Sequence, residues 1–303
     1  MKRGLVWFGV AGLLLAGQAA AKSHFVIVGG LGGEERYAKQ WSEAVDGLKE
    51  ACRKTAGDDA LIHVLKGRAA TKEAIEAVFA RLRQETAAGD IVAVFLIGHG
   101  SYDGHDYRFN IPGRDLTARE IKGLLDSLPA KDQLIAITTS SSGASVEQLK
   151  ADRRIVITAT KSAGERTVTV FAEHWVEALR DPEADTNKDE VITALEAFTY
   201  ADKKVQDFYA GDKRLATEHA RLEGELAANF TLTRLGSALD AASNPKLRPL
   251  FEQRSGIERR IAELKSRKDA MEAAAYSAEL QTLLIELART QAEIDAVSGR
   301  DQQ

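Results

Sequence analysis

The sequence predicts an α/β fold in which helices cover both faces of a mostly parallel sheet. Five short apolar runs support this prediction, in the segments 25–28, 61–65, 91–100, 134–143 and 155–160. Unbroken apolar runs of this length, rich in β-branched residues, are typical of strands that are buried on both faces. Helical apolar patterns lie between the runs, and this alternation implies parallel strands joined by right-handed crossovers.

The first 21 residues have the pattern of a secretory signal peptide. Residues 1–3 are Met, Lys and Arg, residues 4–17 form an apolar run, and residues 19–21 match the Ala-x-Ala cleavage site of such peptides. The apolar run is shorter than the roughly 20 residues that a membrane-spanning helix needs. We therefore expect removal of residues 1–21, export to the periplasm or the medium, and no membrane span in the mature chain.

Composition excludes some classes of function. The 41 Lys and Arg against 45 Asp and Glu give a formal net charge of -4, which offers no basic surface for nucleic acid. Cys52 is the only cysteine, so the chain cannot form an intramolecular disulfide. Because Cys52 lies in a helical pattern, we interpret it as a buried structural thiol; the alternative is a displaced nucleophile.

A glycine-rich turn, residues 29–33, joins the first strand to a helix. The dinucleotide fingerprint needs a third glycine where this chain has Glu35, and the Gly-Lys-Ser/Thr ending of a phosphate loop is absent. We therefore interpret the glycines as a loop that passes close over the strand ends. The helix that follows has an apolar face formed by Trp41, Ala44, Val45, Leu48 and Cys52.

Further helices of the α/β domain are predicted near 71–82, 115–128, 171–179 and 193–209. Thr71 is placed to cap the first of them. Residues 215–219 are the last predicted element of this domain. His219 stands beside Glu218 there, either as an edge histidine or as part of an acid-base or metal pair.

Two strand ends carry side chains that are suited to catalysis. His99 follows one apolar run and Ser140, Ser141 and Ser142 follow the next. In an open α/β sheet, ligands bind outside the carboxyl ends of the strands, and a histidine with a hydroxyl suggests a base and its nucleophile. The alternative is a turn histidine and serines that only cap the next helix.

The strand followed by His99-Gly100, and the next strand ending in a Ser-Gly turn, resembles the legumain-like branch of the caspase-haemoglobinase cysteine peptidases over residues 25–179. The resemblance implies a caspase-like three-layer α/β/α fold. It also implies that His99 is the base, that Gly100 and Ser140 supply oxyanion-hole N–H groups, and that Ser142 belongs to the Ser-Gly pair. The nucleophile position falls on Ser140, where the family has cysteine.

The same resemblance implies substrate-binding positions. Arg36, in the first loop, is the nearest match to a basic residue of the family's specificity pocket. Thr138 stands where legumain has an acidic residue, so a preference for asparagine is not implied. Ser142 and Thr160 border the implied cleft, the latter at the end of the fifth strand.

Three functions remain open. The interpretation that we favour is a degenerate peptidase homologue with a peptide-binding cleft, because a serine hydroxyl needs stronger base assistance than a thiol and no carboxylate partner for His99 is evident. The second is an active endopeptidase that uses Ser140 and His99. The third is a calcium-responsive scaffold or assembly protein.

Residues 185–196 resemble the calcium loop of an EF-hand. Its ligand positions 1, 3, 5, 7 and 12 would fall on Asp185, Asn187, Asp189, Val191 and Glu196. Position 6, where glycine is usual, is Glu190, and a non-glycine residue at positive φ costs on the order of 1 kcal/mol. The alternative is an acidic helix N-terminus without metal. No other cofactor is expected.

Beyond residue 244 the composition shifts to Glu, Lys, Arg, Ala and Leu, with apolar residues in 4-3 heptad spacing. One continuous helix over this region would be roughly 60 Å long and would need a partner chain, which predicts self-association. A hairpin that turns near 275–277 would bury the seam internally, and we favour it. The predicted organisation is a signal peptide over 1–21, an α/β domain over 22–240, and a helical hairpin or coiled coil over 244–303.

Overall fold

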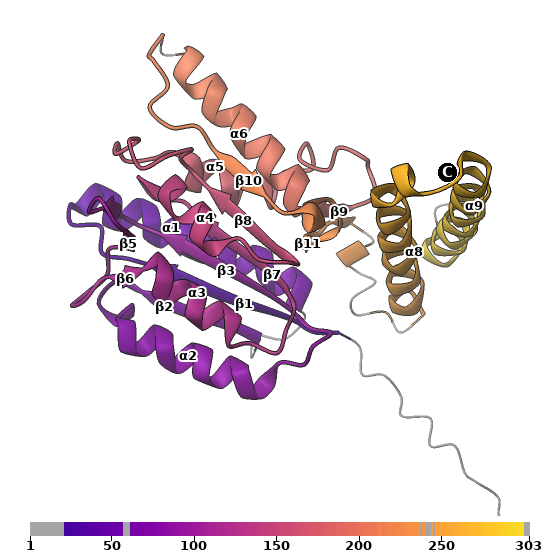
Figure 1. Ribbon diagram of the computed structural model, residues 1–303, viewed down its shortest axis with the longest axis horizontal. Coiled ribbons are helices and arrows are strands. Elements are labelled where there is room, and N and C mark those ends of the chain that lie inside the picture. Colours follow the sequence, from indigo (N-terminus) through magenta and orange to yellow (C-terminus); the bar gives the residue numbers. More distant parts are fainter. Residues whose placement is uncertain are drawn as a thin grey trace, which may run out of the picture.

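The computed structural model describes residues 21–56, 61–211, 213–236, 238–239, 244 and 246–299. Most of the predicted signal peptide, residues 1–20, lies outside the described residues. A six-stranded sheet forms the centre of the molecule in the order β10-β8-β7-β3-β1-β2 (Figure 1). Its strands are β1 (Ser23–Gly29), β2 (Ile62–Lys66), β3 (Ile91–Ile97), β7 (Asp132–Ile137), β8 (Arg154–Thr158) and β10 (Arg221–Glu223). Only the edge strand β10 runs antiparallel to its neighbour, which confirms the mostly parallel sheet.

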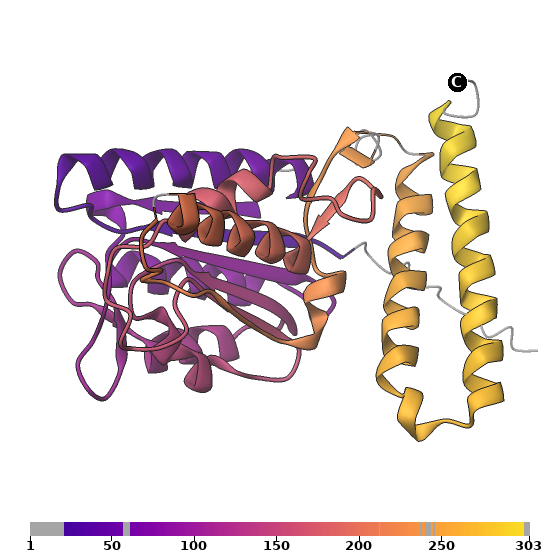
Figure 2. The ribbon, with the colours of Figure 1, turned by 90° about the horizontal axis from the view of Figure 1, so that it is seen from above.

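Helices cover both faces of this sheet (Figures 1 and 2). One face carries α1 (Glu35–Ala56), α5 (Phe171–Ala178) and α6 (Ala194–Gly211), and the other carries α2 (Lys72–Glu85), α3 (Ala118–Asp126) and α4 (Val146–Leu149). The side chains of β1 alternate between the two cores: Phe25 and Ile27 point to the first, Val26 and Val28 to the second. Two apolar cores on opposite faces explain why the strands are almost uninterruptedly apolar.

Local capping fixes two of the helix starts. The Thr71 hydroxyl accepts a hydrogen bond from the Ala74 N–H over 3.2 Å at the start of α2, as the sequence predicts. At α3, Thr117 and Glu120 form a reciprocal capping box. Each cap satisfies backbone N–H groups that the first turn of a helix leaves without partners.

A small antiparallel sheet, which the sequence pattern does not predict, follows β3. It consists of β4 (Gly100–Tyr102), β5 (Tyr107–Phe109) and β6 (Leu116–Thr117). The turn between β4 and β5 depends on Asp103, whose carboxylate accepts the backbone N–H of Asp106 and the side chain of Arg108. These hydrogen bonds lower the pKa of Asp103 well below its usual range. Strands this short leave no periodic pattern in a sequence.

The α/β domain also continues beyond residues 215–219, its last predicted element. The chain forms the edge strand β10, the short helix η4 (Glu225–Asn229) and β11 (Thr231–Arg234). Strand β11 pairs antiparallel with β9 (Val191–Thr193), far from it in sequence. These short strands again lack a repeating pattern, and their pairing depends on tertiary contacts.

The C-terminal region is a hairpin of two antiparallel helices, as predicted (Figure 2). Helix α8 (Arg248–Ser266) packs on α9 (Ala273–Ser298) through Ile257, Ile261, Leu264 and Leu283. The turn lies at 267–272 instead of 275–277, because the Glu272 carboxylate caps α9 by accepting the Ala275 N–H over 3.0 Å. A second cluster, formed by Val191, Ala238, Leu247, Phe251 and Ile294, joins the hairpin to the α/β domain. Within the described ranges, no helix is long and apolar enough to cross a membrane.

Two histidines are buried near the amino ends of the strands. His24 on β1 is 1% exposed, and neither of its ring nitrogens has a hydrogen-bond partner among the described residues. Its Nε2 lies 3.7 Å from a carboxylate oxygen of Asp90. His63 on β2 is also buried, with an unpartnered Nε2. Burial lowers the pKa of both imidazoles, although the charge of Asp90 opposes this effect at His24.

We expect acidification to destabilise the fold through these two side chains. The unfolded chain takes up protons as pH falls through about 6.5, whereas the buried imidazoles resist protonation until lower pH. The free energy of unfolding should therefore decrease as pH is lowered from about 6.5. Urea unfolding at several pH values measures this dependence.

The double variant His24→Gln/His63→Gln should have a shallower pH dependence than wild type. His105→Gln is the matched control, because His105 lies exposed in the turn between β4 and β5. Equal slopes in wild type and the double variant would contradict this interpretation.

Candidate functional site

The carboxyl ends of β3 and β7 lie side by side because these strands are neighbours in the parallel sheet. β3 leads to His99 and Gly100, and β7 leads to Ser140. A Cβ atom added to Gly100 would lie 2.5 Å from the carbonyl oxygen of Ser140. No side chain fits in that space, so the position requires glycine. The structure thus brings the segments of the candidate base and the candidate nucleophile to one edge of the sheet.

The imidazole of His99 is held by the first loop and by α1. Its ring packs edge-on against Trp41, with 4.5 Å between the ring centroids, and against Tyr37 at 5.7 Å. Its Nε2 lies 3.3 Å from the carbonyl oxygen of Gly32. Because a carbonyl oxygen can only accept, this hydrogen bond places a proton on Nε2 and leaves Nδ1 to take up another. Among the described residues, no carboxylate is hydrogen-bonded to this ring.

The Ser140 side chain is directed toward β4. Its hydroxyl donates to the carbonyl oxygen of Gly100 over 2.9 Å. The preceding Thr139 hydroxyl donates to the Ser140 carbonyl oxygen over 3.1 Å and is itself bonded to the Tyr107 hydroxyl. A serine hydroxyl has one proton to donate, and here a peptide carbonyl receives it. In this part of the described chain, the hydrogen bonds of Ser140 and His99 do not join the two side chains.

Residues 140–143, the serine turn, are fixed by the loop that follows β8. Ser141 has a φ of 55°, and its N–H donates to the Glu165 carbonyl oxygen over 2.7 Å. The Gly143 N–H donates to the Thr160 hydroxyl over 2.9 Å. A Cβ at Gly143 would lie 2.3 Å from the backbone of Lys161, so this approach also requires glycine. The turn is therefore rigid and determined by long-range contacts.

The four predicted substrate-binding residues occupy different environments. Arg36 is 70% exposed, and its contacts among the described residues are with Glu34 and Tyr37, beside it in sequence. Thr138 is buried and donates to the Leu96 carbonyl oxygen. The side chains of Ser142 and Thr160 are also buried, and their hydroxyl oxygens lie 3.1 Å apart. The last three side chains support the serine turn from within, and contact of any of the four with a substrate stays a prediction.

A histidine–carboxylate pair lies beside the serine turn. His219 Nδ1 lies 2.5 Å from the Glu165 carboxylate, which also accepts the Lys161 N–H over 2.8 Å. The pair joins residues 54 positions apart, so sequence spacing gives no indication of it. Glu218, the neighbour considered in the sequence analysis, is buried and accepts the Val170 N–H at the start of α5. Burial raises the pKa of Glu218.

Cys52 does not supply an alternative nucleophile. It lies in α1, 1% exposed, within the core between α1 and the sheet. Burial raises the pKa of its thiol well above the usual range, so the thiolate needed for attack is not populated near neutral pH. This agrees with its interpretation as a structural thiol.

Acidic side chains of the loop over residues 185–196 accept hydrogen bonds from backbone N–H groups. The Asp185 carboxylate accepts the N–H groups of Asp189 and Glu190, over 3.2 Å and 2.9 Å. Glu196 and Thr193 form a reciprocal cap at the start of α6. Glu190 has the positive φ, 64°, that position 6 of a calcium loop requires, and its carboxylate accepts the Ala238 N–H over 3.0 Å. That contact explains why a strained non-glycine residue is retained there.

The guanidinium group of Arg254 contacts this loop. Arg254, on α8, is 3% exposed, and its Nη2 donates to the carbonyl oxygen of Asp189 over 3.3 Å. The same nitrogen lies 3.9 Å from the Asp189 carboxylate. Burial raises the pKa of Asp189, and the charge of Arg254 opposes that effect. Within the described ranges, no three His, Cys, Asp or Glu side chains are grouped to hold a metal. Calcium binding by the loop stays a prediction.

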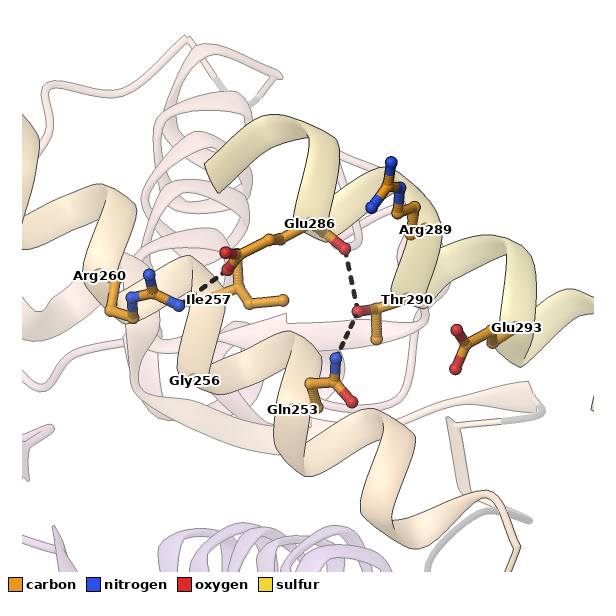
Figure 3. A pocket seen from close by; sticks show the side chains of 8 residues that line it. All are labelled: Gln253, Gly256, Ile257, Arg260, Glu286, Arg289, Thr290 and Glu293. Atoms are coloured by element: carbon orange, nitrogen blue, oxygen red, sulfur yellow. Dashed lines mark hydrogen bonds and ion pairs between the residues drawn. The ribbon is translucent and has the colours of Figure 1, made fainter. Parts of the chain in front are cut away.

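A surface cavity of about 420 Å³ lies between α8 and α9, away from the strand ends (Figure 3). It is lined by Gln253, Gly256, Ile257, Arg260, Glu286, Arg289, Thr290 and Glu293. The Thr290 hydroxyl bridges the two helices: it accepts from Gln253 over 3.1 Å and donates to the Glu286 carbonyl oxygen over 3.0 Å. The lining combines charges of both signs and holds neither histidine nor cysteine. The candidate chemistry therefore remains at the strand ends.

Comparison with known proteins finds a family match over most of the α/β domain. A model of the Peptidase C13 family matches residues 39–211, which include His99 and Ser140 but not Arg36. A protein from Geobacter sulfurreducens is 11% identical with a TM-score of 0.44, covering 67% of this chain and 94% of its own. Caspase-1 from Spodoptera frugiperda is 13% identical with a TM-score of 0.45, covering 67% of this chain and 86% of its own. Both structures are thus only distantly similar. No curated protein matches the chain.

Gly100→Ala tests the close approach of the two strand ends. The new Cβ would meet the Thr139 hydroxyl at 2.3 Å and the Ser140 carbonyl oxygen at 2.5 Å. We expect a loss of about 1–3 kcal/mol in the free energy of unfolding, measured with urea. Gly123→Ala, in α3, is the control: its Cβ would meet nothing within 4 Å, so alanine should leave stability unchanged or raise it. An undiminished stability in Gly100→Ala would contradict the contact.

Arg254→Met tests whether this arginine supplies the positive charge of the 185–196 loop. If it does, millimolar calcium should raise the melting temperature of the variant more than that of wild type, because the loop's acidic groups lose their internal cation. Magnesium and the double variant Arg254→Met/Asp185→Asn are the controls, and neither should show the increase. Equal calcium shifts in wild type and Arg254→Met would contradict this role.

Proposed function

Because this chain belongs to the Peptidase C13 family, we propose that it is an exported homologue of these peptidases that has lost hydrolytic activity and keeps a peptide-binding cleft. The observation that carries the proposal is the environment of Ser140, at the position where the resemblance places the family's cysteine nucleophile. Its hydroxyl donates to the Gly100 carbonyl oxygen, while His99 uses Nε2 to contact Gly32. These bonds leave base and nucleophile uncoupled.

The chemistry of the side chains supports loss of activity. A cysteine attacks as a thiolate, which a modest change of environment populates near neutral pH. A serine hydroxyl must lose its proton at the moment of attack, so it needs a base that is hydrogen-bonded to it and oriented by a third group. His99 is oriented by Trp41 and Tyr37, which cannot stabilise an imidazolium as a bonded carboxylate does.

Peptide binding does not depend on the nucleophile. Membership of a peptidase family implies a peptide as the natural ligand class. The exposed Arg36 and the half-exposed His219, at the same edge of the sheet as the serine turn, offer hydrogen-bonding side chains to such a ligand. Export stays part of the proposal and depends on the predicted signal peptide.

One observation favours the second candidate, an active Ser-His endopeptidase. The close approach of Gly100 to Ser140 keeps the two strand ends together, so rotation of the Ser140 hydroxyl away from Gly100 would free its proton. A third candidate, self-association through the hairpin, is favoured by the exposed apolar side chains Leu284, Ile285 and Val297 on α9. Both remain predictions.

Incubation with a mixed peptide library, followed by mass spectrometry of the products, tests the proposal. We expect no cleavage by the wild-type mature chain. Ser140→Cys should gain cleavage because it restores the thiol, and Ser140→Cys/His99→Ala should lose that gain because the base is removed. Ser145→Cys is the matched control, since Ser145 lies two positions beyond the end of the serine turn, is buried, and is hydrogen-bonded to Ser142.

Cleavage by wild type that disappears in Ser140→Ala and in His99→Ala would instead establish the active serine peptidase. If no variant cleaves a peptide, a pull-down with the same library tests whether the chain binds peptides without cleaving them. Peptides enriched by wild type and lost in Arg36→Ala would support the cleft, and no enrichment would overturn it.

A further inference from the structure

The buried carboxylate of Asp90 accepts a hydrogen bond from the backbone N–H of Lys22, at the edge of the sheet opposite the serine turn. Asp90 precedes β3, and its side chain is 9% exposed. One carboxylate oxygen accepts the Lys22 N–H over 2.8 Å, and the other accepts the Ala87 N–H over 2.8 Å. The carbonyl oxygen of Lys22 in turn accepts the Ile91 N–H over 2.9 Å. Lys22 thus continues the pairing of β1 with β3.

The charge of Asp90 has no fixed cation in this environment. The only ion-pair partner it has among the described residues is His24, at 3.7 Å. The His24 ring is buried, and burial lowers its pKa, so the imidazole is held neutral near neutral pH. The remaining charges close to His24 are those of Glu85 and Lys22. A buried carboxylate is normally paired with a positive charge, so we expect a positive charge beside Asp90.

Proteolytic processing would supply that charge at the atom already bonded to Asp90. Residues 19–21 form the predicted signal-peptidase site, so cleavage there leaves Lys22 as the first residue. Hydrolysis of the Ala21–Lys22 peptide bond adds one water molecule. The carboxylate leaves with the signal peptide, and the amine stays on Lys22 and takes up a proton from solvent.

We infer that Asp90 is the binding site for the α-ammonium group of a chain that has been cut between Ala21 and Lys22. In the uncut chain the Lys22 nitrogen is a neutral peptide N–H, and in the cut chain it is a cation at the same position. The bond in the uncut chain already has an ionised acceptor, and cleavage adds the attraction between two opposite unit charges at a buried site. Cleavage therefore makes the anchoring of β1 tighter. The inference rests on the export stated in the proposed function, and it is independent of the catalytic state of Ser140.

Two measurements test it. The full chain is expressed with residues 1–21 in a secreting bacterial host, and the intact mass of the exported protein gives its first residue. Thermal unfolding then compares a chain that begins at Lys22 with a chain that retains Ala20 and Ala21. We expect export to yield Lys22 as the first residue, and the cut chain to melt about 2–4 °C above the extended chain at neutral pH.

Asp90→Asn, introduced into both chains, should abolish the difference because the carboxamide keeps an acceptor oxygen but no charge. Asp132→Asn is the matched control: Asp132 also opens a strand of the sheet, but it is paired with Arg153, so the difference should persist. Acetylation of the α-amine of Lys22 removes the cation without changing Asp90. The melting temperature of the acetylated chain therefore tests the ammonium site if Asp90→Asn does not fold.

A first residue other than Lys22 overturns the inference together with the export site on which it rests. Equal melting temperatures of the cut, extended and acetylated chains overturn the ammonium site alone. Neither result bears on peptide cleavage or binding at the serine turn, so the two proposals fail separately.

Discussion

The close contact between the ends of β3 and β7 is the constraint on which the candidate site depends. Two parallel strands that are buried on both faces must leave the sheet at the same edge, and their continuations then compete for the same space. Gly100 resolves this competition because it has no side chain where Thr139 and Ser140 pass. Around that contact, β4 and the serine turn form a rigid base.

The two histidines at this edge of the sheet have different partners. His99 is enclosed by aromatic rings and a peptide carbonyl, while the Glu165 carboxylate, beside the serine turn, is hydrogen-bonded to His219. This carboxylate therefore pairs with a histidine other than the candidate base.

Most of the fold could be predicted from the sequence, because the apolar runs of β1, β3, β7 and β8 are long and uninterrupted. The proximity of the ends of β3 and β7 could also be predicted, since parallel strands align their carboxyl ends. The pairing of β9 with β11, the edge strand β10 and the sheet β4–β6 could not be found, because two to four residues carry no period. The hairpin turn was misplaced since the capping carboxylate of Glu272 stands in a helix-forming sequence. The Glu165–His219 pair joins distant positions, which a single sequence cannot indicate.

From the arrangement of the hydrophobic clusters we expect the molecule to unfold as two cooperative units. The hairpin buries its own seam between α8 and α9, and it meets the α/β domain through the small cluster around Val191 and Phe251. Neither of the two cores that sandwich the sheet includes a residue of α8 or α9. Separation of the hairpin would therefore cost little buried area compared with unfolding of the sheet, so the domain can retain its strand ends while the helices exchange partners or fray.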